Sequence, residues 1–256
     1  MGIINLSPDS FSADGLEPNS ALEQALAFVE QGADIIDIGA ESTRPGASPI
    51  SPAVEQSRLV PIINRLVGKL NVPISVDCYK YDVAHACLEA GAHIINDIWG
   101  LQYDTKLAEL ATEYNAPIIL TSNQRGQDCV GDIMHIVKTD LSRAIAICRQ
   151  AKVPTENIIV DPGIGFGKTL EQNFQILRRL DELAELGYPI LLGTSRKEFI
   201  GNILGLPTAQ RLAGTATTNS IGIAKGADII RVHDVQFMAQ VAKMSDILVR
   251  VPNDER

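Results

Sequence analysis

Eight short runs rich in isoleucine and valine occur along the chain, and each ends in polar side chains that could contact a ligand. These polar residues are Asn5, Asp37, Asp77, Asn96 with Asp97, Ser122 with Asn123, Asp161, the triplet Ser195, Arg196 and Lys197, and Arg231 with His233. At any single position, Asp or Asn is best explained as a helix cap or an Asx turn. All eight together are better explained as a ring of amides, carboxylates and cations that orients a polar heterocycle.

Four basic side chains indicate that the ligand is an anion. Arg44, Lys197, Arg231 and His233 are expected at one rim of a chain whose formal net charge is −9. A local cluster of cations on an acidic protein focuses positive potential on a phosphate or a carboxylate. The sequence therefore predicts a substrate that bears one of these groups.

Several common catalytic motifs do not occur in the sequence. Residues 161–169 do not match a phosphate-binding P-loop, because Pro162 stands where the first glycine belongs. We expect the glycines of this segment to let the backbone approach a flat ligand closely. The histidines and cysteines form no zinc-binding pattern, and there is no G-x-S-x-G motif. A nucleophile–base pair of Ser195 and His233 stays a minor alternative.

The elements that must position these residues alternate between strand and helix. Strands are expected over residues 2–6, 35–38, 74–76, 93–95, 118–120, 158–160, 190–192 and 229–232. Helices are expected over residues 20–31, 52–69, 81–90, 106–114, 132–150, 172–186, 209–225 and 235–248. The nearly continuous apolar runs are typical of parallel strands covered on both faces. Eight such units in 256 residues predict one (β/α)8 barrel domain over residues 1–256, because an open sheet usually has fewer strands.

The composition argues against several classes of protein. With 31 acidic and 22 basic side chains, a general nucleic-acid binder or a binder of anionic membranes is not expected. No apolar run reaches the ~18 residues of a membrane-spanning helix, and the N-terminus lacks the features of a secretory signal. We therefore expect a cytoplasmic protein with reduced cysteines. The sequence leaves open whether residues precede Met1 in the gene product.

Seven blocks of sequence, spread over the whole chain, resemble the dihydropteroate synthase family of folate biosynthesis. The blocks are residues 1–12 (MGIINLSPDSFS), 37–47 (DIGAESTRPGA), 75–80 (SVDCYK), 95–97 (IND), 161–169 (DPGIGFGKT), 193–197 (GTSRK) and 230–235 (IRVHDV). The resemblance implies a transferase that condenses 6-hydroxymethyl-7,8-dihydropterin diphosphate with p-aminobenzoate to give 7,8-dihydropteroate and diphosphate. It also implies a dissociative mechanism, competition by sulfonamides and a possible homodimer.

By the same resemblance, the catalytic residues are Asp77, Asp161, Lys197, Arg231 and His233. Asp161 would accept two N–H groups of the pterin edge, and Asp77 with Asn96 would read other ring nitrogens. Lys197 would donate to the ring oxygen and N5, and Arg231 would stack on the pterin face while reaching the diphosphate. The further substrate-binding residues are Asn5, Asp9, Phe11, Thr43, Arg44, Pro45, Asn96, Phe166 and Gly193.

The diphosphate end of the implied site includes a magnesium cofactor. Asn5 is the family's Mg²⁺ position, and His233 would help to stabilise the departing diphosphate. The loops of residues 9–11 and 43–45 would close over the diphosphate and, with Phe166 and Lys197, border the p-aminobenzoate pocket.

Three departures from the family pattern keep other functions open. Ala13, or a shifted Asp14, replaces a loop carboxylate, and Ser122 replaces an imidazole. Glu198 replaces a serine that meets the p-aminobenzoate carboxylate; pointing inward, it would oppose that anion by on the order of 4 kcal/mol, whereas pointing outward it would favour the helix N-terminus. The alternatives are a pterin-binding paralogue without synthase activity and the pterin domain of a folate-dependent methyltransferase. The Arg231 and His233 pair favours the synthase.

Overall fold

The computed structural model describes residues 1–6, 18–42, 47–127 and 129–250 and contains eight parallel strands that alternate with helices. The strands are β1 (Gly2–Asn5), β2 (Ile36–Gly39), β3 (Ile74–Asp77), β4 (Ile94–Asp97), β5 (Ile118–Thr121), β6 (Ile158–Asp161), β7 (Leu191–Leu192) and β8 (Ile229–Ile230). The predicted strands are confirmed, with ends that differ by one or two residues. Asp9, Phe11, Ala13, Asp14, Thr43, Arg44 and Pro45 lie outside the described residues.

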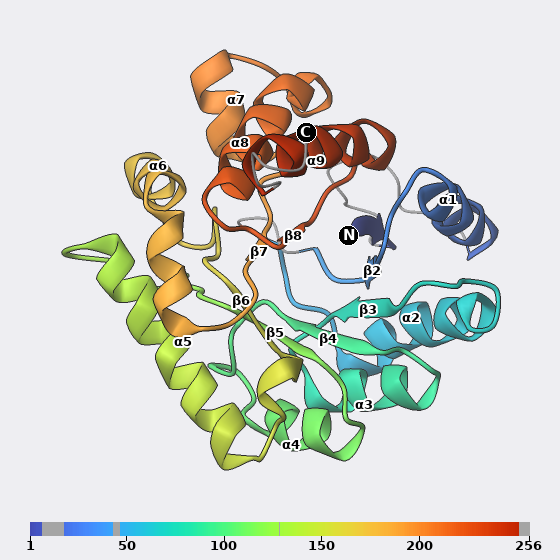
Figure 1. Ribbon diagram of the computed structural model, residues 1–256. Coiled ribbons are helices and arrows are strands. Elements are labelled where there is room, and N and C mark those ends of the chain that lie inside the picture. The colour runs from blue at the N-terminus through green and yellow to red at the C-terminus, as the bar shows by residue number, and fades with distance from the viewer. Residues whose placement is uncertain (7–17, 43–46, 128, 251–256) are drawn as a thin grey trace.

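The eight strands close into a barrel. Strands β1 to β6 pair in sequence order as one parallel sheet, and β7 pairs with β8. Two single bridges complete the ring, one from Val160 to Ile190 and one from Gly2 to Val232. The helices surround the strands on the outside (Figure 1). The predicted (β/α)8 architecture is therefore confirmed.

Most of the α-helices begin and end close to the residues that the sequence predicts. They are α1 (Pro18–Glu30), α2 (Pro52–Leu66), α3 (Tyr81–Glu89), α4 (Lys106–Glu113), α5 (Ile133–Gln150), α6 (Leu170–Arg178), α7 (Glu198–Leu204), α8 (Leu212–Ala224) and α9 (Val235–Val249). Ser51 caps α2 ahead of Pro52, and Thr169 forms a capping box with Gln172 at the start of α6. None of the helices formed by the described residues is both long and apolar enough to cross a membrane.

Two expectations about helices are wrong. The segment 172–186 is not one helix, because Arg179 leaves the helical conformation (φ −119°) and a 3-10 helix, Leu180–Leu186, follows α6. Residues 209–225 likewise divide into a 3-10 turn at Thr208–Gln210 and the helix α8. In addition, α7 is a short helix that the sequence pattern did not predict.

Alternation along the strands gives the barrel interior an apolar floor and a polar upper layer. The floor is a small buried cluster of Met1, Ile94, Ile119, Ile159 and Leu191. Side chains two residues apart on a strand share a face. Asn96, Thr121 and Asp161 therefore lie above the floor, at the carboxyl ends of β4, β5 and β6. The intervening residues Ile95, Ile118, Leu120, Ile158 and Val160 belong to the main core.

Candidate active site

An open cavity of about 310 Å³ lies at the carboxyl ends of the strands. Seven residues that the sequence predicts for the site line it: Asn5, Asp77, Phe166, Gly193, Lys197, Arg231 and His233. They come from strands β1 and β3 and from the loops that follow β6, β7 and β8. The cavity thus brings together residues that are up to 228 positions apart in the chain, as 233 − 5 = 228.

Arg231 joins two carboxylates at the centre of this cavity. Its Nε donates to Asp37 Oδ2 at 2.6 Å, and its Nη2 donates to Asp77 Oδ2 at 2.7 Å. Burial raises the pKa of Asp77 to about 7, and the positive charge of Arg231 opposes that shift. Asp37 is fully buried in β2. The sequence names it among the polar strand ends, but the family resemblance gives it no role in the site.

Asn96 and Asp161 are buried and do not line the cavity, although the sequence places both in the site. The Asn96 amide donates to both carboxylate oxygens of Asp37, at 3.2 and 3.3 Å. Asp161 Oδ1 accepts a hydrogen bond from the Gly163 backbone at 2.7 Å. Burial raises the pKa of Asp161, against the attraction of Lys197, Lys168 and Arg231. Neither Asp37 nor Gly163 lines the cavity, so Asn96 and Asp161 are held by buried groups behind its wall.

The amine of Lys197 lies beside the ring of Phe166. Lys197 Nζ is 4.7 Å from the ring centroid and donates to the backbone carbonyl of Ile164. Burial lowers the pKa of Lys197 to about 7, while Asp161 raises it. The guanidinium carbon of Arg125 is 4.6 Å from the same ring centroid. Arg125 also lines the cavity, and the sequence reasoning missed it because it stands beyond the strand end, in a loop.

Two glycines of the loop after β6 approach the loop after β5 rather than the cavity, whereas Gly165 between them lines the cavity. A Cβ atom at Gly163 would overlap the carbonyl oxygen of Ser122, and one at Gly167 would overlap the backbone of Gln124. Lys168 fastens the same loop, because its Nζ donates to Ser122 O at 2.8 Å and to Gly163 O at 3.0 Å. The expectation that these glycines approach a ligand is therefore corrected for Gly163 and Gly167. They allow this loop to pack against the loop after β5.

Ser195 and His233 are in direct contact. Ser195 Oγ lies 2.9 Å from His233 Nδ1 and accepts the backbone N–H of His233 at 3.1 Å. Burial, followed by the positive charge of Arg231, lowers the pKa of His233 to about 3. His233 is thus a neutral hydrogen-bonding residue and not one of the predicted cations. An imidazole this weakly basic is a poor acceptor for a serine proton, which argues against the nucleophile–base pair.

Comparisons with known proteins agree with this geometry. The sequence model of the family described as pterin binding enzyme matches residues 1–233. A dihydropteroate synthase from Bacillus subtilis is 48% identical over 251 residues, covering 97% of this chain and 88% of the relative. The chain belongs to the dihydropteroate synthase family.

Solved structures of this family have the same fold. The dihydropteroate synthase from Clostridium difficile, determined in the presence of pteroic acid, is 45% identical with a TM-score of 0.94 and covers 98% of this chain and 96% of that chain. The enzyme from Xanthomonas albilineans, determined with 4-aminobenzoic acid, is 36% identical with a TM-score of 0.92, covering 98% and 93%.

Two of the three departures from the family pattern lie within the described residues. Ser122 is buried, and its hydroxyl donates to Asp140 Oδ2 of α5 at 3.1 Å, so it is turned away from the cavity. Glu198, the first residue of α7, is exposed and lines the cavity. The Ser122 departure thus alters a helix contact, whereas Glu198 places a carboxylate at the wall of the dihydropteroate synthase cavity.

Proposed function

We propose that this cavity performs the dihydropteroate synthase reaction on 6-hydroxymethyl-7,8-dihydropterin diphosphate and p-aminobenzoate. The observation that carries the proposal is the charge arrangement in one cavity. Asn5, Asp77, Lys197, Arg231 and His233 line the cavity, while the buried residues Asp37, Asn96 and Asp161 do not line it. Such an arrangement suits a substrate with a donor-rich heterocycle at one end and a diphosphate at the other.

The carboxylates recognise the pterin ring through hydrogen bonds. The free oxygen of Asp161 accepts from the amino-pyrimidine edge, since its Oδ1 is already engaged by Gly163. Asp77 and Asn96 are held in place through Arg231 and Asp37, which fixes the direction of their remaining hydrogen-bonding groups. Lys197 donates to the ring oxygen and N5. Well-made bonds to charged groups contribute about 1.5–3 kcal/mol each, so two or three of them hold the pterin.

The bond that breaks joins the pterin methylene carbon to the diphosphate oxygen, and its electron pair leaves with diphosphate. The amine of p-aminobenzoate then forms a C–N bond to the same carbon and releases one proton. Arg231 and the N–H of neutral His233 stabilise the charge that develops on the leaving oxygen. No protein nucleophile takes part, which is consistent with the low basicity of His233.

Magnesium fits the opening of this cavity as a cofactor. Asn5 ends β1, is half-buried and carries a side-chain carbonyl oxygen that borders the cavity. Among the described residues, no three His, Cys, Asp or Glu side chains gather as a metal cage. Mg²⁺ commonly binds through one or two protein oxygens, substrate phosphates and water, so Asn5 is sufficient as its protein ligand. When bound, the ion would neutralise charge on the diphosphate.

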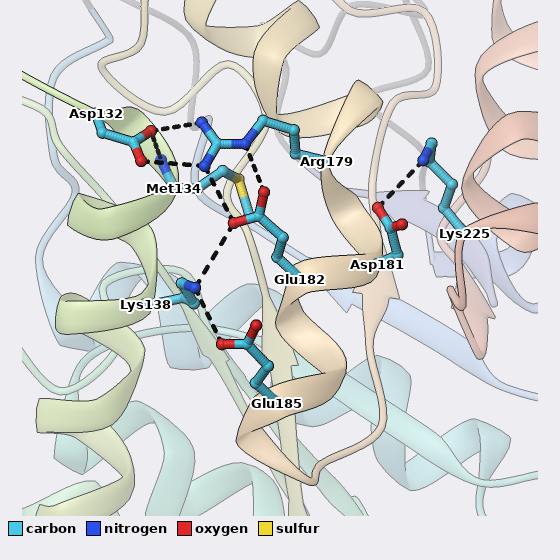
Figure 2. Close-up of polar contacts among 8 residues, drawn as sticks. All are labelled: Asp132, Met134, Lys138, Arg179, Asp181, Glu182, Glu185 and Lys225. Atoms are coloured by element: carbon cyan, nitrogen blue, oxygen red, sulfur yellow. Dashed lines mark hydrogen bonds and ion pairs between the residues drawn. The ribbon is translucent and has the colours of Figure 1, made fainter.

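The decisive experiment is a steady-state assay of diphosphate release that depends on p-aminobenzoate and Mg²⁺. We expect turnover by the wild type, and loss of pterin binding in Asp161→Asn, because the amide presents N–H groups to the donors of the pterin. Asp181→Asn, which changes an exposed carboxylate paired with Lys225 (Figure 2), is the control and should keep full activity. Binding of pterin diphosphate without turnover would instead identify a pterin-binding paralogue, and no binding would refute the proposal.

A homodimer and a cytoplasmic location are further parts of the proposal. Large apolar side chains of α8 and α9 are exposed, including Ile221, Phe237, Met244, Ile247 and Leu248. Exposed apolar patches of this kind mark contact sites between proteins, and members of the family commonly dimerise through barrel helices. Sedimentation velocity should give twice the mass of one chain, and Leu248→Glu should shift it toward the monomer.

A further inference from the structure

Two adjacent contacts join the turn after β7 to the turn after β8. The first is the contact between Ser195 and His233 at the cavity wall. The second is a two-point ion pair, in which Arg196 Nε donates to Asp234 Oδ2 at 3.0 Å and Arg196 Nη2 donates to Asp234 Oδ1 at 2.5 Å. Both side chains of this pair are 22% exposed. Consecutive residues of one turn are thus fastened to consecutive residues of the other.

Neither partner of this ion pair has the local structure that its residue type favours. Arg196 has φ +56°, the left-handed region that L residues other than Asn and Asp rarely occupy. Asp234 precedes α9 as its N-cap residue, yet its side chain accepts no hydrogen bond from that helix. The Asp234 carboxylate thus binds Arg196, which has an unfavourable φ, instead of capping α9. This indicates that the ion pair fixes the conformation of the turn after β7.

The constraint concerns residues that line the cavity. Arg196 lies between Ser195 and Lys197, and the three line the cavity together. Its backbone is held from the other side, because Arg196 N donates to Thr215 Oγ1 at 3.1 Å and its carbonyl accepts from Arg211 Nη1 at 3.0 Å. Asp234 itself does not line the cavity.

We propose that Asp234 is a positioning residue. It acts through Arg196 to keep Ser195 and Lys197 at fixed positions relative to His233. The assignment rests on the proposed function, since Lys197 and His233 are its pterin and diphosphate contacts. Misplacement of such groups by about 1 Å can lower turnover about 100-fold.

Three variants test the assignment. Asp234→Asn removes the ion pair. Arg196→Gly also removes it, but keeps the backbone contacts with Thr215 and Arg211 and suits a positive φ. We expect both to lower kcat/KM by about 10- to 100-fold while the Tm of Arg196→Gly stays within a few degrees of the wild type. The double variant should be no worse than either single variant, because both remove the same contact.

A matched control is the ion pair of Arg179 and Asp132 on the outer helices. It is also a two-point ion pair, in which Arg179 Nη1 donates to Asp132 Oδ1 at 2.6 Å and Nη2 donates to Oδ2 at 3.0 Å (Figure 2). Asp132→Asn keeps a good N-cap for α5 and should leave kcat/KM unchanged. A decrease in Asp132→Asn equal to that in Asp234→Asn would overturn the assignment.

Calorimetry with inorganic diphosphate separates positioning from direct contact. If Arg196 bound the diphosphate itself, Asp234→Asn would release its guanidinium and keep or increase the affinity, whereas Arg196→Gly would lose affinity. The positioning role predicts weaker binding in both. Retained affinity in Asp234→Asn, or activity within twofold of the wild type, would refute it. Wild-type protein without p-aminobenzoate-dependent turnover would instead refute the proposed function.

Discussion

Arg231 and Asp77 meet across the barrel interior, with 2.7 Å between Nη2 and Oδ2. Arg231 follows β8, in the two-stranded part of the barrel, and Asp77 ends β3, in the six-stranded part. The side chains are 20% and 12% exposed, so neither charge is well solvated. The pair therefore links the two parts of the barrel through a partly buried charge at the centre of the cavity.

Replacing Arg231 should cost much of the stability. Arg231→Met leaves Asp37 and Asp77 buried without their shared cation, and removal of one partner of a buried ion pair costs about 3–5 kcal/mol. Urea unfolding at pH 8 measures this loss. The control is Arg178→Met, which removes an exposed pair with Glu171 and should change the unfolding free energy by less than about 1 kcal/mol. Equal effects of the two substitutions would contradict the structure.

The pH dependence of stability should report on Lys197. Its pKa is about 7 in the folded protein against 10.5 as its ordinary value, because burial disfavours the ammonium. Between these values the unfolded chain binds the proton and the folded protein does not, so this residue makes stability rise with pH. The unfolding free energy of Lys197→Met should therefore exceed that of the wild type by most at or below pH 7. This excess should decrease as the pH rises toward 10. Denaturant unfolding at several pH values will measure it. A constant difference would show that the amine is not desolvated.

Two glycines with similar positive φ angles separate the effect of steric overlap from the effect of backbone strain. Gly163 has φ +70° and Gly187 has φ +76°. A methyl group at 163 would overlap the Ser122 carbonyl, whereas nothing lies within 4 Å of a methyl group at 187. Gly187→Ala should cost about 1–2 kcal/mol from the left-handed conformation alone. Gly163→Ala should cost about 3 kcal/mol or more and also displace Phe166. Thermal unfolding compares the two, and equal losses would contradict the close packing of the two loops.

Removing the negative charge of Glu198 should help p-aminobenzoate to bind. Glu198 is exposed at the cavity wall, so water and salt screen its repulsion of the benzoate carboxylate. We expect Glu198→Gln to lower the KM for p-aminobenzoate by about two- to fivefold at low ionic strength and by less in 0.5 M salt. Glu156→Gln removes the same charge ahead of β6, at the other end of the barrel, and should leave KM unchanged. An unchanged KM in Glu198→Gln would place its carboxylate away from the benzoate.

Much of the fold could be predicted because each buried strand corresponds to a short apolar run in the sequence. Residues such as Ile158 to Asp161 show an apolar run that ends in a polar group, and the structure has a strand with those bounds. Because the strands are parallel, their carboxyl ends all lie at the same end of the barrel. Of the seven predicted site residues that line the cavity, Asn5, Asp77, Lys197, Arg231 and His233 follow from this rule. Phe166 and Gly193 were implied by the family resemblance.

The parts that could not be predicted depend on contacts between distant residues. The ionisation of His233 is set by burial and by Arg231, so its residue type alone suggested a cation. The role of Gly163 depends on Ser122, which is 41 residues earlier in the chain, as 163 − 122 = 41. The contact between Asp37 and Arg231 joins residues 194 positions apart, and no local sequence pattern indicates it.

The unequal pairing around the barrel has a consequence for substrate binding. Strands β7 and β8 have two residues each and meet their outer neighbours through one bridge on either side. Lys197, Arg231 and His233 follow these short strands, whereas Asp77, Asn96 and Asp161 belong to strands of four residues. A ligand that contacts both groups of residues would stabilise the two weakly paired junctions of the barrel, between β6 and β7 and between β8 and β1. Deuterium uptake at residues 190–192 and 229–232 should therefore slow when the cavity is filled.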